Sequence, residues 1–381
     1  MIKKEFSLPM PYSTEYIKKM LDINHKVEKS AITSLYACLP SNCELFTGFE
    51  QTRNFEFDKS DFDYWKSLFR FCLEKGIDII YLLNSPSAFN FKNNSYSKKL
   101  EKLDELLNEF KKIGINKLRV ANPQLMSYLG KYYKDFNIYA STSLDYKTIS
   151  EYQNLILMHG EIKQIIPSHD INKNFKLLKN IKLNYPNLEI ELMVNEGCMQ
   201  GCPHRNLHEN IYYDNNALKI SDLAISGSYC LFFCSHITEK YPFHSLTLNN
   251  NIYPWELEEY QKIGINKFKL VGRDSFTYRI EHCLNDYLNY FKAIENYKEV
   301  EDVPITTFIH HLTGSRELND IKTKEIKHLL PKIEHFKKHG ELCASRCGVE
   351  CRYCYKCAEK IQKVFEQKQK ELIKRTIPFA F

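Results

Sequence analysis

Short apolar, β-branched runs alternate with amphipathic helical stretches along this 381-residue chain, and this alternation constrains the fold more than any other feature. Strands that are separated by helices form parallel sheets, and eight strand–helix repeats close into a barrel. The sequence therefore predicts an α/β fold, a TIM-like (β/α)₈ barrel. A doubly wound open sheet is the rival, but no glycine-rich phosphate turn follows the first run. The eight predicted strands are Lys4–Leu8, Ala31–Ala37, Ile77–Leu83, Lys117–Val120, Asn137–Ala140, Gln164–Ile166, Leu188–Val194 and Lys267–Val271.

The helices predicted between these strands have clear end signals. Gly76, Gly114 and Gly264 follow three of them, where a left-handed residue commonly ends a helix. A further long helix is predicted near Thr277–Tyr297. The other predicted helices are Ser13–Asp22, Lys59–Lys75, Ser97–Ile113, Pro123–Lys134, Leu144–Tyr152, Ile171–Leu183 and Trp255–Ile263.

Two regions break the alternation. The first region, residues 195–253, separates the seventh strand from its helix and is far longer than an ordinary βα loop. Barrels carry their active sites at the C-terminal ends of the strands, so we expect this insertion on the functional face. We predict a barrel over residues 1–297 that includes the insertion, followed by a cysteine-rich C-terminal extension over residues 298–381.

The composition, 43% hydrophobic and 26% charged, is that of a globular protein. The formal net charge of +6 is spread along the chain and forms no compact nucleic-acid-binding motif. The amino terminus has no apolar signal region, and no run approaches the ~18 apolar residues of a membrane span, so we expect a cytoplasmic protein without membrane contacts. In a reducing compartment the thirteen cysteines are better suited to metal binding than to disulfides.

The insertion contains two C-x₃-C pairs, Cys198 with Cys202 and Cys230 with Cys234. Four thiolates select zinc or an iron–sulfur cluster. Their irregular, glycine-containing loop favours the larger, shielded cluster over a zinc ion, which more often sits in tight knuckles. The alternatives are a zinc ion and a set of unliganded core cysteines.

The extension contains a second cysteine group, which we predict to be another metal site, iron–sulfur or zinc, with one cysteine to spare. Residues 347–354 match the spacing of the radical S-adenosylmethionine motif, but that motif follows the first strand of a barrel, and few residues follow it here. The group consists of Cys343, Cys347, Cys351, Cys354 and Cys357.

Polar residues at predicted strand ends can line a pocket at the barrel mouth. Lys269 and Arg273 are suited to clamp an anionic substrate. Ser168 and Asp170 precede a helix and are expected to cap it. The main pocket candidates are His204, Arg205, His208, Lys269 and Arg273, and the wider set adds Asn122, Ser141, Ser143, Ser168, His169, Asp170, Asn195, Glu196 and Asp274.

Three motifs resemble the collagenase-like peptidase family U-32: "ELMVNEGC…CPHR" over residues 191–205, "GSYC…C" over 227–234, and the run 255–273. The resemblance covers roughly residues 1–297 and is strongest over 188–275. It implies a barrel, a [4Fe-4S] cluster on four cysteines, and oxygen-independent hydroxylation of ubiquinone precursors or RNA bases. In some relatives an early strand-end loop completes the cluster, which points to Cys38 or Cys43 as an alternative fourth ligand.

The sequence thus predicts an iron–sulfur oxidoreductase or oxygen-independent hydroxylase that acts on a small molecule or RNA, with a protein partner or electron donor. A peptidase, as the family name implies, is the second hypothesis, although no Gly-x-Ser-x-Gly or His-Glu-x-x-His motif is present. The third is a non-catalytic scaffold stabilised by its metals.

Overall fold

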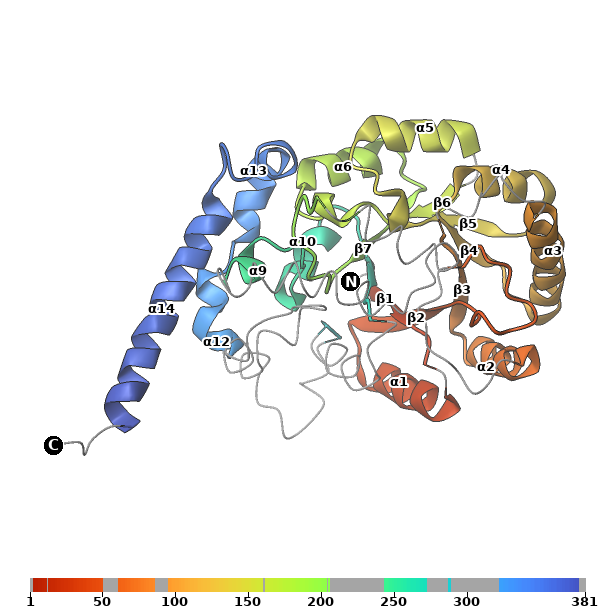
Figure 1. The fold of residues 1–381 in the computed structure, drawn as a ribbon, viewed down its shortest axis with the longest axis horizontal. Helices are drawn as coiled ribbons and strands as arrows, with labels where there is room; N and C mark the ends of the chain where they lie inside the picture. Colours follow the sequence, from red (N-terminus) through yellow and green to blue (C-terminus); the bar gives the residue numbers. More distant parts are fainter. Residues whose placement is uncertain are drawn as a thin grey trace.

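The structure, a computed structural model, describes residues 3–11, 13–50, 61–85, 95–159, 162–203, 205, 243–272, 287–288 and 322–376. Its eight strands form one closed barrel in which each strand pairs in parallel with the next and β8 pairs with β1 (Figure 1). The predicted (β/α)₈ fold is therefore confirmed. The strands are β1 (Lys4–Pro9), β2 (Ser30–Ala37), β3 (Asp78–Leu83), β4 (Lys117–Val120), β5 (Asn137–Ala140), β6 (Ile162–Ile165), β7 (Glu189–Met193) and β8 (Lys267–Lys269).

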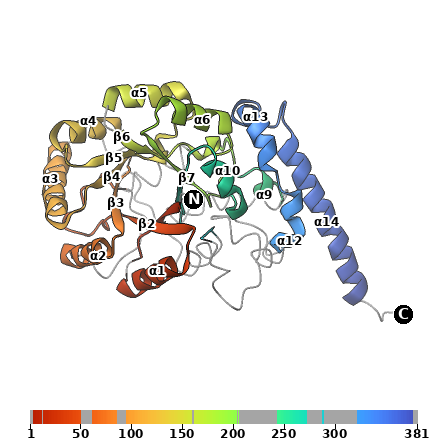
Figure 2. The same cartoon turned by 180° about the vertical axis from the view of Figure 1, so that it is seen from behind.

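Helices surround the barrel and continue into the C-terminal extension, which lies at one side of it in both views (Figures 1 and 2). Short 3₁₀ turns η1 (Thr142–Leu144), η2 (His169–Ile171), η3 (Pro254–Glu256) and η8 (Lys327–Leu329) connect them. The α-helices are α1 (Thr14–Lys26), α2 (Phe62–Glu74), α3 (Ser95–Ile113), α4 (Pro123–Tyr132), α5 (Ile149–His159), α6 (Phe175–Asn184), α9 (His244–Thr247), α10 (Leu257–Gln261), α12 (Thr323–Ile326), α13 (Ile333–Ser345) and α14 (Tyr353–Thr376).

Local chemistry explains several helix ends. Asp61 accepts a hydrogen bond from the Asp63 N–H at the start of α2, and Asn122 accepts one from the Leu125 N–H at the start of α4. The predicted glycine stops are confirmed, since Gly76, Gly114 and Gly264 have φ values of +73°, +88° and +82°. These left-handed residues turn the chain toward β3, β4 and β8.

The predicted helix Leu144–Tyr152 is wrong at its start, because α5 begins at Ile149. Asp145 has φ +52°, a left-handed conformation that ends η1. The Glu151 carboxylate then accepts the Thr148 N–H at 2.7 Å and holds the chain in a cap just before the helix. Asp145 and Lys147 therefore lie in the connection between β5 and α5 and not in a helix.

The predicted helix Ile171–Leu183 also starts too early. Asn174 accepts the Leu177 N–H and caps α6, which begins at Phe175. Ser168 does act as a cap, accepting the Asp170 N–H at 3.3 Å, but for the short turn η2. The long helix predicted near Thr277–Tyr297 lies outside the described residues, apart from 287–288.

The barrel interior is partly polar. The guanidinium of Arg119 on β4 lies 2.5 Å from Glu191 on β7 and 2.7 Å from Gln164 on β6. Since β4 and β7 are not neighbours, this ion pair spans the interior, where both side chains are at most 3% exposed. Apolar residues on the outward faces of the strands pack against the surrounding helices.

The extension packs closely against the barrel. Helix α13 lies on α6 and α14 on α9. Gly340 permits the first contact, because a Cβ at this position would lie 2.5 Å from the Lys173 carbonyl oxygen. The Lys173 ammonium lies 4.8 Å from the centroid of the Phe336 ring on α13. None of the helices in the described residues is both long and apolar enough to span a membrane.

Candidate functional site

The loop after β7 leaves the barrel and returns to it as a paired stem. The Gln200 N–H donates to the Leu248 carbonyl at 3.0 Å, and Met199 forms an antiparallel bridge with Asn249. Asn195 at the base of the stem exchanges two hydrogen bonds with the Val271 backbone after β8, at 2.7 and 3.0 Å. The stem therefore fixes the position of Cys198 at the C-terminal end of the barrel.

Cys198 and Cys202, predicted as ligands, are in contact in this loop. Their side chains hydrogen-bond to each other, and Gly201, with φ +64°, allows the turn between them. The Glu196 carboxylate accepts the Cys198 N–H at 3.0 Å. The hydrogen bond with Cys202, and then burial, raise the pKa of the Cys198 thiol well above its usual value.

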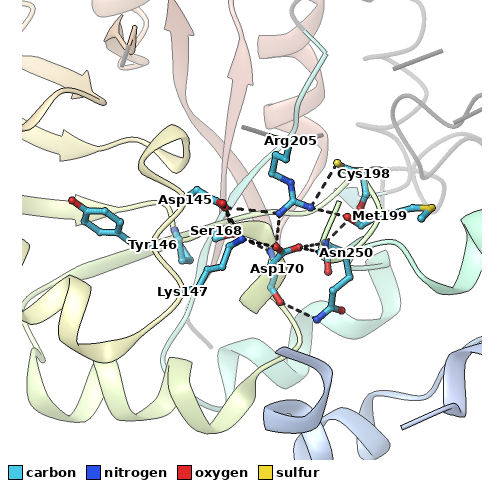
Figure 3. Close-up of polar contacts among 12 residues, drawn as sticks. Asp145, Tyr146, Lys147, Ser168, Asp170, Cys198, Met199, Arg205 and Asn250 are labelled. Carbon is cyan, nitrogen blue, oxygen red and sulfur yellow. Dashed lines mark hydrogen bonds and ion pairs between the residues drawn. The ribbon is translucent and has the colours of Figure 1, made fainter. Parts of the chain in front are cut away.

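Arg205 connects this cysteine pair to the rest of the site (Figure 3). Its guanidinium lies 3.7 Å from the Cys198 sulfur, donates to the Met199 carbonyl at 2.7 Å, and lies 2.5 Å from the Asp170 carboxylate. The side chain is 5% exposed. A buried guanidinium that donates to sulfur suits a thiolate or an anionic metal–thiolate group.

Asp170, after β6, is the centre of the polar contacts. One carboxylate oxygen accepts the Gly201 N–H at 3.0 Å and the Asn250 amide at 3.1 Å, while the other faces Arg205 and Lys147. Burial alone would raise the pKa of Asp170, but the hydrogen bond and charge of Arg205 lower it overall. The carboxylate is therefore held ionised, as an anchor rather than an acid catalyst.

Asp145 and Lys147, after β5, complete a balanced set of two carboxylates and two cations. The Lys147 ammonium lies 2.9 Å from Asp145 and 3.0 Å from Asp170. The Ser168 hydroxyl donates to Asp145 at 2.5 Å. The sequence interpretation missed Asp145 and Lys147 because it placed them in a helix, although they follow a predicted strand end.

His169 is buried beside these charges with 6% exposure, and neither ring nitrogen has a hydrogen-bond partner among the described residues. Burial, and then the Arg205 charge, lower its pKa to about 3. The imidazole is therefore neutral at physiological pH.

The other predicted pocket residues are scattered. Asn122 caps α4 and Ser141 caps η1, so both side chains have structural roles. The Lys269 ammonium lies 4.2 Å from the Tyr36 ring centroid inside the barrel. The remaining candidates lie outside the described residues: His204, His208, Cys230, Cys234, Arg273 and Asp274.

The two alternative ligands lie on the loop after β2. Cys38 packs against Tyr36 and the other inward residues of the barrel. Cys43 is buried next to Glu44, and burial raises the pKa of its thiol to about 12.

In the extension, Cys343 ends α13, while Cys347, Cys351 and Cys354 follow around the junction with α14. The Gln200 amide donates to the Cys343 carbonyl at 2.7 Å and so links this junction to the loop of Cys198. Across the described ranges, no three His, Cys, Asp or Glu side chains are already placed to hold a metal ion.

No protein-family model matches the chain. It is 25% identical over 259 residues to an uncharacterized protease of Methanocaldococcus jannaschii, covering 68% of this chain and 70% of that protein. The alignment with the solved structure of a U32 peptidase covers 71% of this chain and 93% of that chain, with 12% sequence identity and a TM-score of 0.45. The alignment with the structure of CpGH84B covers 98% of this chain and 72% of that chain, with 10% sequence identity and a TM-score of 0.38.

In sequence, the chain is thus similar to an archaeal protein that is named as a protease. Cys198, Cys202 and Arg205 lie within the run 191–205 that resembles the U-32 family.

Proposed function

We propose that this chain is an iron–sulfur oxidoreductase of the oxygen-independent hydroxylase type within the U32 family, with a [4Fe-4S] cluster bound by Cys198, Cys202, Cys230 and Cys234. One observation carries the proposal: two cysteine side chains touch at the C-terminal end of the barrel while a buried guanidinium donates to one of them. Soft thiolates that receive N–H donors are the usual surroundings of iron–sulfur clusters. Cys38 and Cys43 are the alternatives for the fourth ligand.

The residues around the cysteines have distinct roles in this proposal. Arg205 donates to the Cys198 sulfur, which stabilises negative charge there and tunes the reduction potential. Asp170 holds the guanidinium in place, and Lys147 in turn pairs with the Asp170 carboxylate. The bound cluster would supply one-electron transfer, and these side chains would supply its orientation and electrostatic surroundings.

The substrate is a small molecule or an RNA base, with electrons delivered by a protein donor in the cytoplasm. Lys269 lies at the end of β8, where active-site residues of barrels gather. Together with Arg273 it is suited to bind an anionic group of the substrate.

Proteolysis is the second candidate, supported by the name of the archaeal relative. Hydrolysis needs a nucleophile with an adjacent base. The Ser127–His159 pair, at 3.3 Å, lies on the outer helices α4 and α5. Cys351 and His335, at 3.5 Å, lie in the extension. If Cys351 and His335 form the catalytic pair of a peptidase, Cys351→Ser should abolish cleavage of fluorescent casein.

The deciding experiment is anaerobic purification with iron, acid-labile sulfide and visible absorption measured per chain. We expect about four irons and four sulfides in the wild type, lost in Cys198→Ala. Cys72→Ala, a buried cysteine on α2, is the matched control and should retain the cluster. A colourless wild-type protein without iron, or a Cys198→Ala variant that keeps its iron, would refute the proposal.

A further inference from the structure

The cysteines of the extension gather where α13 meets α14, at a site that the proposed function does not use. Cys343 lies in the last turn of α13 and Cys354 in the first turn of α14. Between them, Cys347 and Cys351 form a backbone bridge, with the Gly348 N–H donating to the Cys351 carbonyl at 2.9 Å. Gly348, at φ +83°, permits this tight turn.

Four of the five side chains converge. Cys343 hydrogen-bonds to Cys351, and Cys347 and Cys354 both lie within electrostatic reach of Cys343. Cys343, Cys351 and Cys354 are buried, and Cys347 is half-buried. Cys357 lies one turn further along α14 and hydrogen-bonds to Tyr353, so it is the spare cysteine.

The close spacing of these cysteines along the chain favours a single ion over a cluster, because structural zinc is held by closely spaced ligands with Zn–S near 2.3 Å. The His335 ring nitrogen lies 3.5 Å from the Cys351 sulfur, within hydrogen-bonding distance. The close partner of the Cys198 sulfur is instead a guanidinium.

We propose that Cys343, Cys347, Cys351 and Cys354 bind one Zn²⁺ in a closed, structural site, with His335 as a hydrogen-bond partner of the Cys351 sulfur. Within the described residues, no three side chains are yet placed to hold an ion, so binding must rotate these side chains inward. The spacings C-x₃-C and C-x₂-C both fall within the range of structural zinc sites.

Zinc at this position would fix the end of α13 against the barrel. The Cys343 carbonyl accepts the Gln200 amide, and Gln200 also donates to the Asp170 carbonyl at 3.3 Å. The close contact of Gly340 with Lys173 lies one turn earlier on the same helix. The proposed ion therefore stabilises the docking of the extension beside the loop of Cys198.

The test uses the full chain with Cys198, Cys202, Cys230 and Cys234 all changed to Ser, which removes the other proposed metal site. Elemental analysis should find about one zinc per chain and no iron in this background. Adding Cys351→Ser should abolish the zinc, whereas adding Cys357→Ser should leave it unchanged. Iron with sulfide in place of zinc, or zinc retained after Cys351→Ser, would overturn the proposal.

Cobalt substitution tests the same site without any substitution in the extension itself. Co²⁺ added to the metal-free background protein should give the intense visible and near-ultraviolet bands of tetrahedral thiolate ligation. Weak bands typical of octahedral oxygen ligation would overturn the proposal. Because the barrel-loop cysteines are absent here, neither result depends on whether the wild type binds an iron–sulfur cluster.

Discussion

Asp170 accepts contacts from two neighbouring loops, those after β5 and β7, and its charge compensates a cation that is almost fully buried. Asp170→Asn would leave Arg205, 5% exposed, without its closest counter-charge. Removing one partner of a buried ion pair costs about 3–5 kcal/mol of unfolding free energy. Urea unfolding should show this loss, with a much smaller loss in Asp145→Asn, whose carboxylate lies 3.8 Å from Arg205. Equal losses in the two variants would contradict the central role of Asp170.

His169 gives the protein a predictable dependence on acid. The unfolded chain protonates a histidine near pH 6.5, whereas folded His169 stays neutral down to about pH 3. Between these values the unfolded state binds more protons, so stability falls as pH falls, by at most about 1.4 kcal/mol per pH unit.

We expect His169→Leu to flatten the decline in unfolding free energy between pH 6.5 and 4.5, measured by urea unfolding. This pH range lies above the range in which protonation of Asp170, whose pKa is lowered in the folded protein, affects the unfolding free energy. His25→Leu on the exposed side of α1 is the control for losing a histidine. An unchanged slope in His169→Leu would show that this imidazole titrates normally.

Among the elements, α13 depends on a glycine for its position. Gly340→Ala would place a Cβ 2.5 Å from the Lys173 carbonyl oxygen, a backbone atom that cannot easily move. We expect a loss of about 1–3 kcal/mol, with faster proteolysis of the extension. Gly130→Ala on α4 is the matched control, because its nearest neighbour lies at 4.0 Å. That change should instead stabilise the protein by up to about 1 kcal/mol. Similar effects of the two changes would argue against tight packing of α13.

At the scale of the whole molecule, the Arg119–Glu191 pair ties opposite sides of the barrel together. Arg119→Met should cost about 3–5 kcal/mol, since it strands a buried carboxylate. The double variant Arg119→Met, Glu191→Met should be considerably more stable than the single one. Urea unfolding of both gives the coupling energy, and a double variant no better than Arg119→Met would show that the carboxylate is not stranded.

Much of the barrel could be predicted from the sequence because its signals are local. β-branched runs such as Ile77–Leu83 and left-handed glycines such as Gly114 depend on a few neighbouring residues. The prediction failed where a side chain decided a boundary, as when Glu151 capped α5 and freed Asp145 and Lys147. The helical periodicity of the sequence does not show where such a cap lies.

The pairing of Cys198 with Cys202 was also a local signal, since only three residues separate them. The assignment of Cys230, Cys234, His204, His208 and Arg273 stays a prediction.

The sequence by itself determined the order of strands and helices and the chemistry available in each loop, because both follow from short-range spacing. The tertiary structure alone decided that Lys147, Asp170 and Arg205 meet, since barrel closure brings the ends of β5, β6 and β7 to one mouth. It also decided that Gln200 reaches Cys343, a contact across 143 positions of the chain. Such contacts depend on the packing of whole elements, and no pattern of neighbouring residues encodes them.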